Sequence, residues 1–138
     1  MRVTSWVVAL LLLVACDTNT SGIIGIANGG GGGSGVANHL AFTVQPTNTA
    51  NGAAIAPAVQ VAALSSSNIT DTTFTSAVSI GLSNPGGVSL GGTDTVTAVR
   101  GVATFQNLVV SGTGTSVRLT ASGPSVTSAS SATFNVGP

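Results

Sequence analysis

The chain has 138 residues, of which 43% are hydrophobic and only 4% are charged, and its formal net charge at pH 7 is zero. An average soluble domain has roughly 25% charged residues. Because Lys and Arg together number three, the chain cannot form a basic patch for nucleic acid or a polybasic surface for anionic lipid. The high apolar content also excludes disorder driven by charge.

The first fifteen residues have the features of an export signal. Arg2 supplies one positive charge, and an unbroken apolar run of ten residues occupies positions 6–15. As a helix this run would span about 15 Å, half of the roughly 30 Å hydrocarbon core of a bilayer. It therefore predicts the hydrophobic region of a signal peptide, residues 1–15, and not a permanent membrane span.

Cys16 is the only cysteine of the chain, and it directly follows Leu13-Val14-Ala15. This LVAC sequence resembles the lipobox of bacterial lipoproteins. The resemblance implies that the signal is cut before Cys16, that its thiol carries a diacylglyceryl group, and that its new amino group is acylated. Two or more acyl chains give stable anchoring, so the expected location is a membrane of the bacterial cell envelope, with the membrane and leaflet left open. An ordinary secretory signal is the alternative.

Residues 16–39 are expected to form a lipidated cysteine followed by a disordered linker. Gly, Asn, Ser and Thr dominate after Cys16, and GGGGGSG occupies positions 29–35. Glycine loses the most backbone entropy on ordering and has no side chain to bury, which favours a flexible coil. A phosphate-binding loop is excluded, because no Lys-Ser/Thr pair follows the glycines.

From residue 40 to the C-terminus, apolar and polar residues alternate with a period of two, which predicts β-strands that bury one face. No segment of this region favours a helix. The predicted inward side chains are Leu40, Phe42, Val44, Val59, Val61, Ala63, Val78, Ile80, Leu82, Val96, Ala98, Ala103, Phe105, Leu108, Val110, Val117, Leu119, Ala121, Ala132, Phe134 and Val136.

Turn residues separate these predicted strands. Asn84-Pro85-Gly86-Gly87 predicts a type II turn with Gly86 in third position, and Arg100-Gly101 predicts a tight turn. Further breaks are expected at 112–115 and 122–125. About seven short strands predict an all-β domain over residues 40–138, an immunoglobulin-like antiparallel β-sandwich. A seven-strand, partly open barrel is the structural alternative.

Two sequence elements carry a resemblance to a known family. With FxVQP at 42–46 and GVATFxxL at 101–108, residues 40–136 resemble a single bacterial immunoglobulin-like module of the kind found in invasin-type adhesins and other surface proteins. The resemblance implies a β-sandwich that serves as a spacer, an adhesive element or a binding module, without catalytic residues. The sequence departs from the family at 64–70, which lacks the usual Asp-x-x-Gly-Asn turn, and at Arg100, where Asn or Asp is common.

The titratable side chains leave little room for catalysis. Paired carboxylates would require Asp71 and Asp94, which lie in different predicted loops, and a Ser-His-Asp triad would require His39 at the linker boundary. We therefore expect no enzyme activity, no cofactor and no metal. Asn68 and Asp71 share a loop but offer one carboxylate to a calcium ion. Asp71 and Asp94 are instead expected to hold turns through hydrogen bonds to the backbone.

The weak candidates for a binding site are Phe74, Asn68 and Asp71. Glycan sites usually stack sugar rings on exposed aromatic side chains. The chain has no Tyr, its single Trp lies within the predicted signal, and Phe74 is the aromatic residue expected to be exposed.

The sequence thus predicts a non-catalytic, lipid-anchored envelope protein that displays one immunoglobulin-like module as a structural, adhesive or binding element. The membrane is its first expected partner, through Cys16, and an envelope protein or a glycan is the second. A glycan-binding accessory module and a remnant of a longer tandem surface protein are alternatives. Because the strands lack the Lys residues that protect sheet edges, weak self-association through edge strands is also expected.

Overall fold

The computed structural model describes residues 35–83 and 85–138. The predicted signal peptide, Cys16 and the linker up to residue 34 lie outside the described residues. All regular structure in the described part is β, so the expected all-β class is confirmed, and none of it is a helix that could cross a membrane. The strands are β1 (His39–Val44), β2 (Thr49–Ala50), β3 (Ala53–Ala54), β4 (Val59–Leu64), β5 (Ala77–Leu82), β6 (Val88–Gly91), β7 (Thr95–Thr97), β8 (Val102–Phe105), β9 (Val109–Gly112), β10 (Gly114–Val117), β11 (Leu119–Gly123), β12 (Val126–Ser130) and β13 (Phe134–Gly137).

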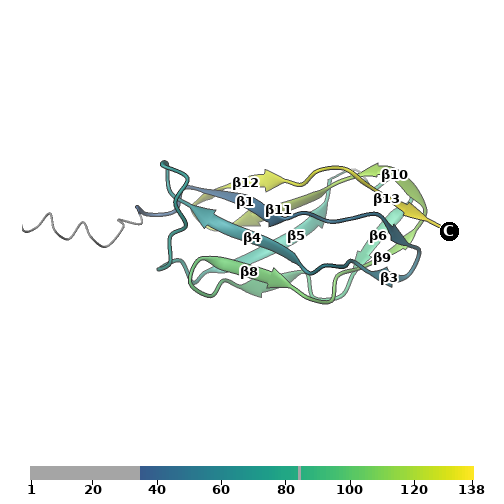
Figure 1. The fold of residues 1–138 in the computed structure, drawn as a ribbon, viewed down its shortest axis with the longest axis horizontal. Coiled ribbons are helices and arrows are strands. Elements are labelled where there is room, and N and C mark those ends of the chain that lie inside the picture. Colours follow the sequence, from purple (N-terminus) through teal and green to yellow (C-terminus); the bar gives the residue numbers. More distant parts are fainter. Residues whose placement is uncertain (1–34, 84) are drawn as a thin grey trace, which may run out of the picture. The chain divides into compact units, whose positions relative to one another are not determined.

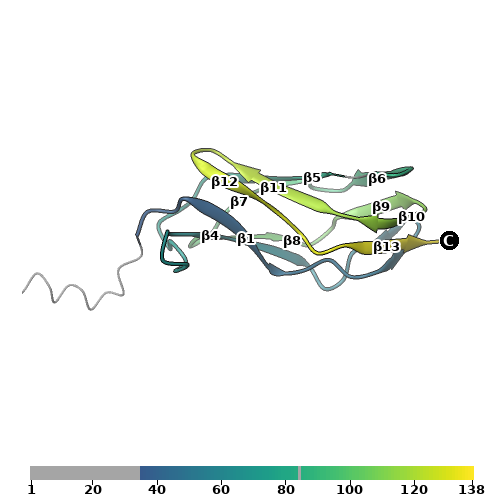
Figure 2. The ribbon, with the colours of Figure 1, turned by 90° about the horizontal axis from the view of Figure 1, so that it is seen from above.

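The strands form one seven-stranded sheet, in the order β7-β5-β11-β12-β1-β4-β8, and two three-stranded sheets, β10-β13-β2 and β3-β9-β6. Seen from above, β5, β11 and β12 lie in one layer and β1, β4 and β8 in another (Figure 2). β1 connects the two layers, because it pairs with β12 of one layer and with β4 of the other. It pairs antiparallel with β4 from His39↔Leu64 to Val44↔Gln60, and parallel with β12 at the single pair His39↔Thr127.

A tight turn joins the two edge strands of the large sheet, β7 and β8. Val99 and Val102 exchange two backbone hydrogen bonds, of 2.9 and 3.1 Å, across Arg100 and Gly101. Both central residues have positive φ, 52° and 84°, as the type I′ turn of a two-residue hairpin requires. The predicted tight turn is confirmed, and it brings the edges of the sheet together, so that the sheet nearly closes on itself.

The core lies between the layers. Its largest fully buried side chains are those of Phe105, Phe134, Leu108 and Leu119, and most of the predicted inward positions are buried. Two positions differ from the prediction. Ala132 is exposed, because it precedes β13 in a loop, and Ala62, predicted to face outward, is 1% exposed. The small side chain of Ala62 lies on β4, between its register partners Ala41 on β1 and Val102 on β8.

The strand count and directions correct the prediction of about seven antiparallel strands. The described residues form thirteen strands, and two pairings, β1 with β12 and β13 with β2, are parallel. β2 and β3 have two residues each, too short to show a period. β12 (VTSAS) is mostly polar, and β6 is bounded by glycines, so neither has the signature of a half-buried strand.

The turn before β6 lies one residue later than predicted. The Val88 N–H donates to the Pro85 carbonyl at 2.6 Å, so the central residues are Gly86 and Gly87, with φ of 48° and 96°. Asn84, the first residue of the predicted type II turn, lies outside the described residues. Gly86 nevertheless has the positive φ that the prediction required of it.

Candidate functional site

Three segments far apart in the sequence meet around Asp71. They are residues 35–38, the β4–β5 loop (65–76) and the β7–β8 turn (99–101), and together we call them the Asp71 end. The β4–β5 loop and the start of β1 lie at the opposite end of the domain from the C-terminus (Figure 1). Asp71 is 3% exposed, so its carboxylate must be satisfied within the protein.

Hydrogen bonds from two of these segments converge on the carboxylate of Asp71. Oδ2 accepts the Ala37 N–H at 3.0 Å, and Oδ1 accepts the Thr73 N–H at 2.9 Å together with the Thr73 hydroxyl. The backbone of Asp71 adds a bond from its N–H to the Ala63 carbonyl at 2.9 Å. The prediction that Asp71 holds a turn through hydrogen bonds between its side chain and the backbone is confirmed by the bond from the Thr73 N–H. The same side chain also binds the backbone of residues 35–38, at Ala37.

These bonds determine the electrostatics of the carboxyl group. The hydroxyl and N–H of Thr73 and the N–H of Ala37 hold the pKa of Asp71 below its ordinary value of 3.8, and burial only partly opposes them. Hydrogen bonds to the charged form stabilise it over the neutral acid. Asp71 is therefore a negative charge at neutral pH, and both of its carboxylate oxygens accept hydrogen bonds from the chain.

The β4–β5 loop brings Asn68 and Asp71 into one segment but not into one site. Asn68 is exposed with φ of 61°, and its Oδ1 lies 3.1 Å from Nε2 of His39. Nδ1 of His39 lies 2.6 Å from Oδ1 of Asn38. His39, expected to be the last residue of the linker, is instead the half-buried first residue of β1. Among the described residues, no group of three or more His, Cys, Asp and Glu is placed to hold a metal.

The expected exposure of Phe74 is wrong. Its side chain is partly buried and packs against the core, because hydrogen bonds fix both the N–H and the carbonyl group of its backbone. The Phe74 N–H donates to the Asp71 carbonyl, and its carbonyl accepts the Gly101 N–H, both at 3.1 Å. A ring that packs inward presents little face for stacking on a sugar.

Asp94 lies in the loop between β6 and β7. Its Oδ1 accepts the Thr95 hydroxyl at 3.1 Å, and its carbonyl accepts the Ile80 N–H at 2.7 Å. The expected bond from its side chain to the backbone is replaced by this bond to a hydroxyl. Asp94 and Asp71 thus have separate sets of partners, and no shared bond joins the two carboxylates into a catalytic pair.

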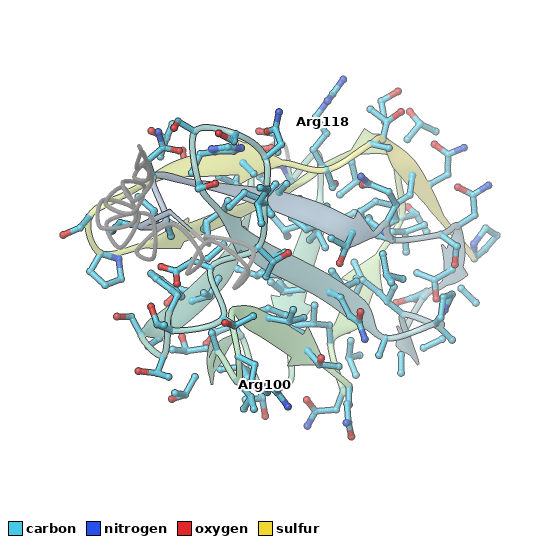
Figure 3. All side chains as sticks on the ribbon, turned by 60° about the vertical axis from the view of Figure 1, so that its left-hand side comes forward. Arg100 and Arg118 are labelled. Carbon is cyan, nitrogen blue, oxygen red and sulfur yellow. The ribbon has the colours of Figure 1, made fainter. Side chains whose placement is uncertain are left out.

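The large hydrophobic side chains that the described part of the chain exposes all belong to the Asp71 end. Val36 is 85% exposed, Val99 70% and Ile69 46%. Arg100, next to Val99, is also exposed, and it lies on the opposite side of the domain from Arg118 (Figure 3). Sequence reasoning missed this group, although Val99 breaks the alternation by following the inward Ala98 directly.

Comparisons with known proteins add information on the fold. No protein-family model and no curated protein matches the sequence. The fold is similar to part of a solved structure, a glycosyl hydrolase family 2 member from Bacteroides cellulosilyticus. The TM-score is 0.56 at 13% sequence identity, over 76% of this chain and 15% of that chain. This chain therefore corresponds to a small part of that much longer protein, and the likeness concerns the fold alone.

No pocket is formed by residues 35–83 and 85–138. The Asp71 end is the surface on which exposed apolar side chains collect, and Cys16, the predicted site of lipid attachment, lies outside the described residues.

Proposed function

We propose that this protein is a lipid-anchored, non-catalytic protein of the bacterial cell envelope that displays one immunoglobulin-like β-sandwich as a structural, adhesive or binding element. The observation that carries the proposal is the position of Cys16. The only cysteine of the chain directly follows an apolar run and Leu13-Val14-Ala15. A lone thiol is otherwise unexpected in an exported protein, where cysteines usually pair.

The arrangement of strands supports the immunoglobulin-like assignment of the domain. Two layers enclose one core, and the first strand, β1, pairs with strands of both layers. The likeness to a segment of a glycosyl hydrolase family 2 member supports a module of the kind that accompanies other domains. A β-sandwich of this kind hosts many functions, so the role follows from its surface and its attachment.

Display is the mechanism that this surface supports. Residues 35–38 and the C-terminus lie at opposite ends of the domain, so a chain attached through residue 35 holds the far end away from its anchor. The described residues form no pocket, and the buried carboxylate of Asp71 is used by its own neighbours. The lipid would determine location, the linker would determine reach, and loops or strand edges would make the contacts.

Replacement of the anchoring residue tests the proposal. In a bacterial host that processes lipoproteins, Cys16→Ser should abolish labelling by radioactive palmitate and move the protein from the membrane fraction to the soluble fraction. Thr18→Ser, two residues away, is the matched control and should stay in the membrane fraction with full labelling. Unchanged membrane partitioning of Cys16→Ser would refute the anchor.

A glycan-binding accessory role is the second candidate, and the fold likeness to part of a glycosyl hydrolase family 2 member is the observation that favours it. The partly buried ring of Phe74 weighs against it. A glycan array probed with the full chain decides between the two roles. Specific binding that Phe74→Ala removes and Thr72→Ala retains would favour the glycan role.

A further inference from the structure

We infer that the Asp71 end docks on the surface of the lipid bilayer in which Cys16 is anchored, with Val36, Ile69 and Val99 entering the interfacial region. The inference rests on the proposed lipid anchor and adds a second, direct contact between the folded domain and the membrane. The anchored domain would then have a preferred orientation, with the C-terminal end of the sandwich farthest from the lipid.

Val36, Ile69 and Val99 belong to three segments that meet at Asp71. Single exposed apolar residues are normal on protein surfaces, but their collection in one place indicates an interaction site. Ala37, next to Val36, donates its N–H to Asp71 at 3.0 Å. Ile69 lies two residues before Asp71, and Val99 lies two residues before Gly101, whose backbone abuts the Asp71 carbonyl. Each apolar side chain is thus within two residues of a contact with Asp71.

The polar groups on the same segments are compatible with contact with a bilayer. The carboxylate of Asp71 is buried among its donors, and the exposed charge on the described segments is that of Arg100. A long cationic side chain can lie along the interface with its charged group in water, whereas an exposed carboxylate would oppose contact with a bilayer. The other exposed residues of the β4–β5 loop are mainly Ser, Thr and Asn, which the hydrated headgroup region accommodates.

The proposed anchor at Cys16 is joined to the domain at the Asp71 end. Nineteen residues separate Cys16 from Val36, a length of chain that spans at most about 70 Å at full extension. The segment enters the domain at Val36, which is itself part of the apolar group, so the Asp71 end is the part of the domain that follows the anchor. Such tethering raises the effective concentration of bilayer near this end, so that even three side chains produce measurable docking.

A labelling experiment on the full lipidated chain tests the inference. Because lipid occupies the thiol of Cys16, Val99→Cys and Val36→Cys each introduce a single free thiol for an environment-sensitive fluorophore. The matched control is Thr115→Cys, at an exposed position of β10 near the other end of the domain. In vesicles of phosphatidylethanolamine and phosphatidylglycerol at 3:1, labels at 36 and 99 should shift to the blue and be quenched by nitroxide lipids. The label at 115 should do neither.

The outcomes separate docking from anchoring. If the protein floats with the vesicles but the labels at 36 and 99 show neither a blue shift nor quenching, docking is overturned and the anchor remains intact. Protein that does not float would overturn the anchor and docking with it. A third outcome is a blue shift of the label at residue 99 that grows with the amount of protein per vesicle while nitroxide lipids fail to quench the label. This would indicate that a second copy of the chain covers the surface, and it would also overturn docking on lipid.

A second variant tests the apolar group itself. With the label at Thr72→Cys in the β4–β5 loop, Val36→Ser combined with Val99→Ser should lower the ratio of docked to undocked domain about tenfold or more. Added salt should leave docking nearly unchanged, because apolar contact and not charge drives it. Unchanged quenching in the Val36→Ser, Val99→Ser double variant would overturn the inference.

Discussion

The backbone of Gly101 lies against the carbonyl oxygen of Asp71, so closely that a Cβ at residue 101 would overlap that oxygen. The two residues are thirty positions apart, one in the β4–β5 loop and the other in the β7–β8 turn. Their contact joins two of the three segments of the Asp71 end, and Gly101 has a φ of 84° there. A glycine is needed at position 101 for both its conformation and its size.

Gly101→Ala should therefore destabilise the domain by about 2 to 4 kcal/mol, through strain at positive φ and the clash with the Asp71 carbonyl. The measurement is urea unfolding of the full chain followed by circular dichroism. The matched control is Gly81→Ala in β5, where φ is not positive and no atom lies near the added Cβ; its effect should stay within about 0.5 kcal/mol. Equal effects of the two changes would contradict the contact.

The stability of the domain should fall in acid because of Asp71. Its folded-state pKa is depressed below 3.8 by the hydrogen bonds from Thr73 and Ala37. The stability that these bonds contribute is present above pH 3.8 and is lost as the pH falls through the folded-state pKa. In Asp71→Asn this acid-dependent loss should disappear, although the variant is less stable at pH 7.

Urea unfolding at a series of pH values from 7 downward measures this effect. Asp94→Asn is the control, because it removes the other acidic side chain among the described residues and leaves the bonds of Asp71 intact. An acid-dependent loss in Asp71→Asn as large as in the wild type would assign the pH dependence to other groups.

Ser131 takes part in a buried connection between β12 and β11. It is 1% exposed, its Oγ accepts the Leu119 N–H at 3.0 Å, and its hydroxyl donates to the Ala132 carbonyl at 2.7 Å. Ser131→Ala should cost about 1 to 3 kcal/mol, since it leaves a buried N–H without a partner. Hydrogen exchange at Leu119 should become faster, and in the control Ser130→Ala, at an exposed position, it should be unchanged.

Leu108 and Val99 should differ sharply when truncated. Leu108 is 0% exposed in the core, and Leu108→Ala should lower the free energy of unfolding by about 2 to 5 kcal/mol through lost burial and a cavity. Val99 is 70% exposed, and Val99→Ala should change the free energy of unfolding by about 0.5 kcal/mol or less. Thermal unfolding of both variants checks this, and a large effect of Val99→Ala would show that its side chain supports the fold.

Much of the architecture could be predicted because the pattern that specifies it is local. Alternation over a few residues places Val61 and Leu119 inward, and a Gly at the end of a tight turn predicts the hairpin at Arg100-Gly101. β12 escaped prediction because its partners β11 and β1, and not its own side chains, make it a strand. Phe74 was misplaced because the bonds that hold its backbone come from Asp71 and Gly101.

The amino-acid sequence by itself determined the all-β class, most of the inward positions and the poverty of reactive groups, since each depends on composition or on neighbours along the chain. It also carries the prediction about Cys16, which stays a prediction. Only the tertiary structure decided that Ala37, Asp71 and Gly101 meet, and that Val36, Ile69 and Val99 share one end of the domain. Contacts between residues thirty or more positions apart depend on how the strands pair, and that pairing leaves no periodic signal in any one segment.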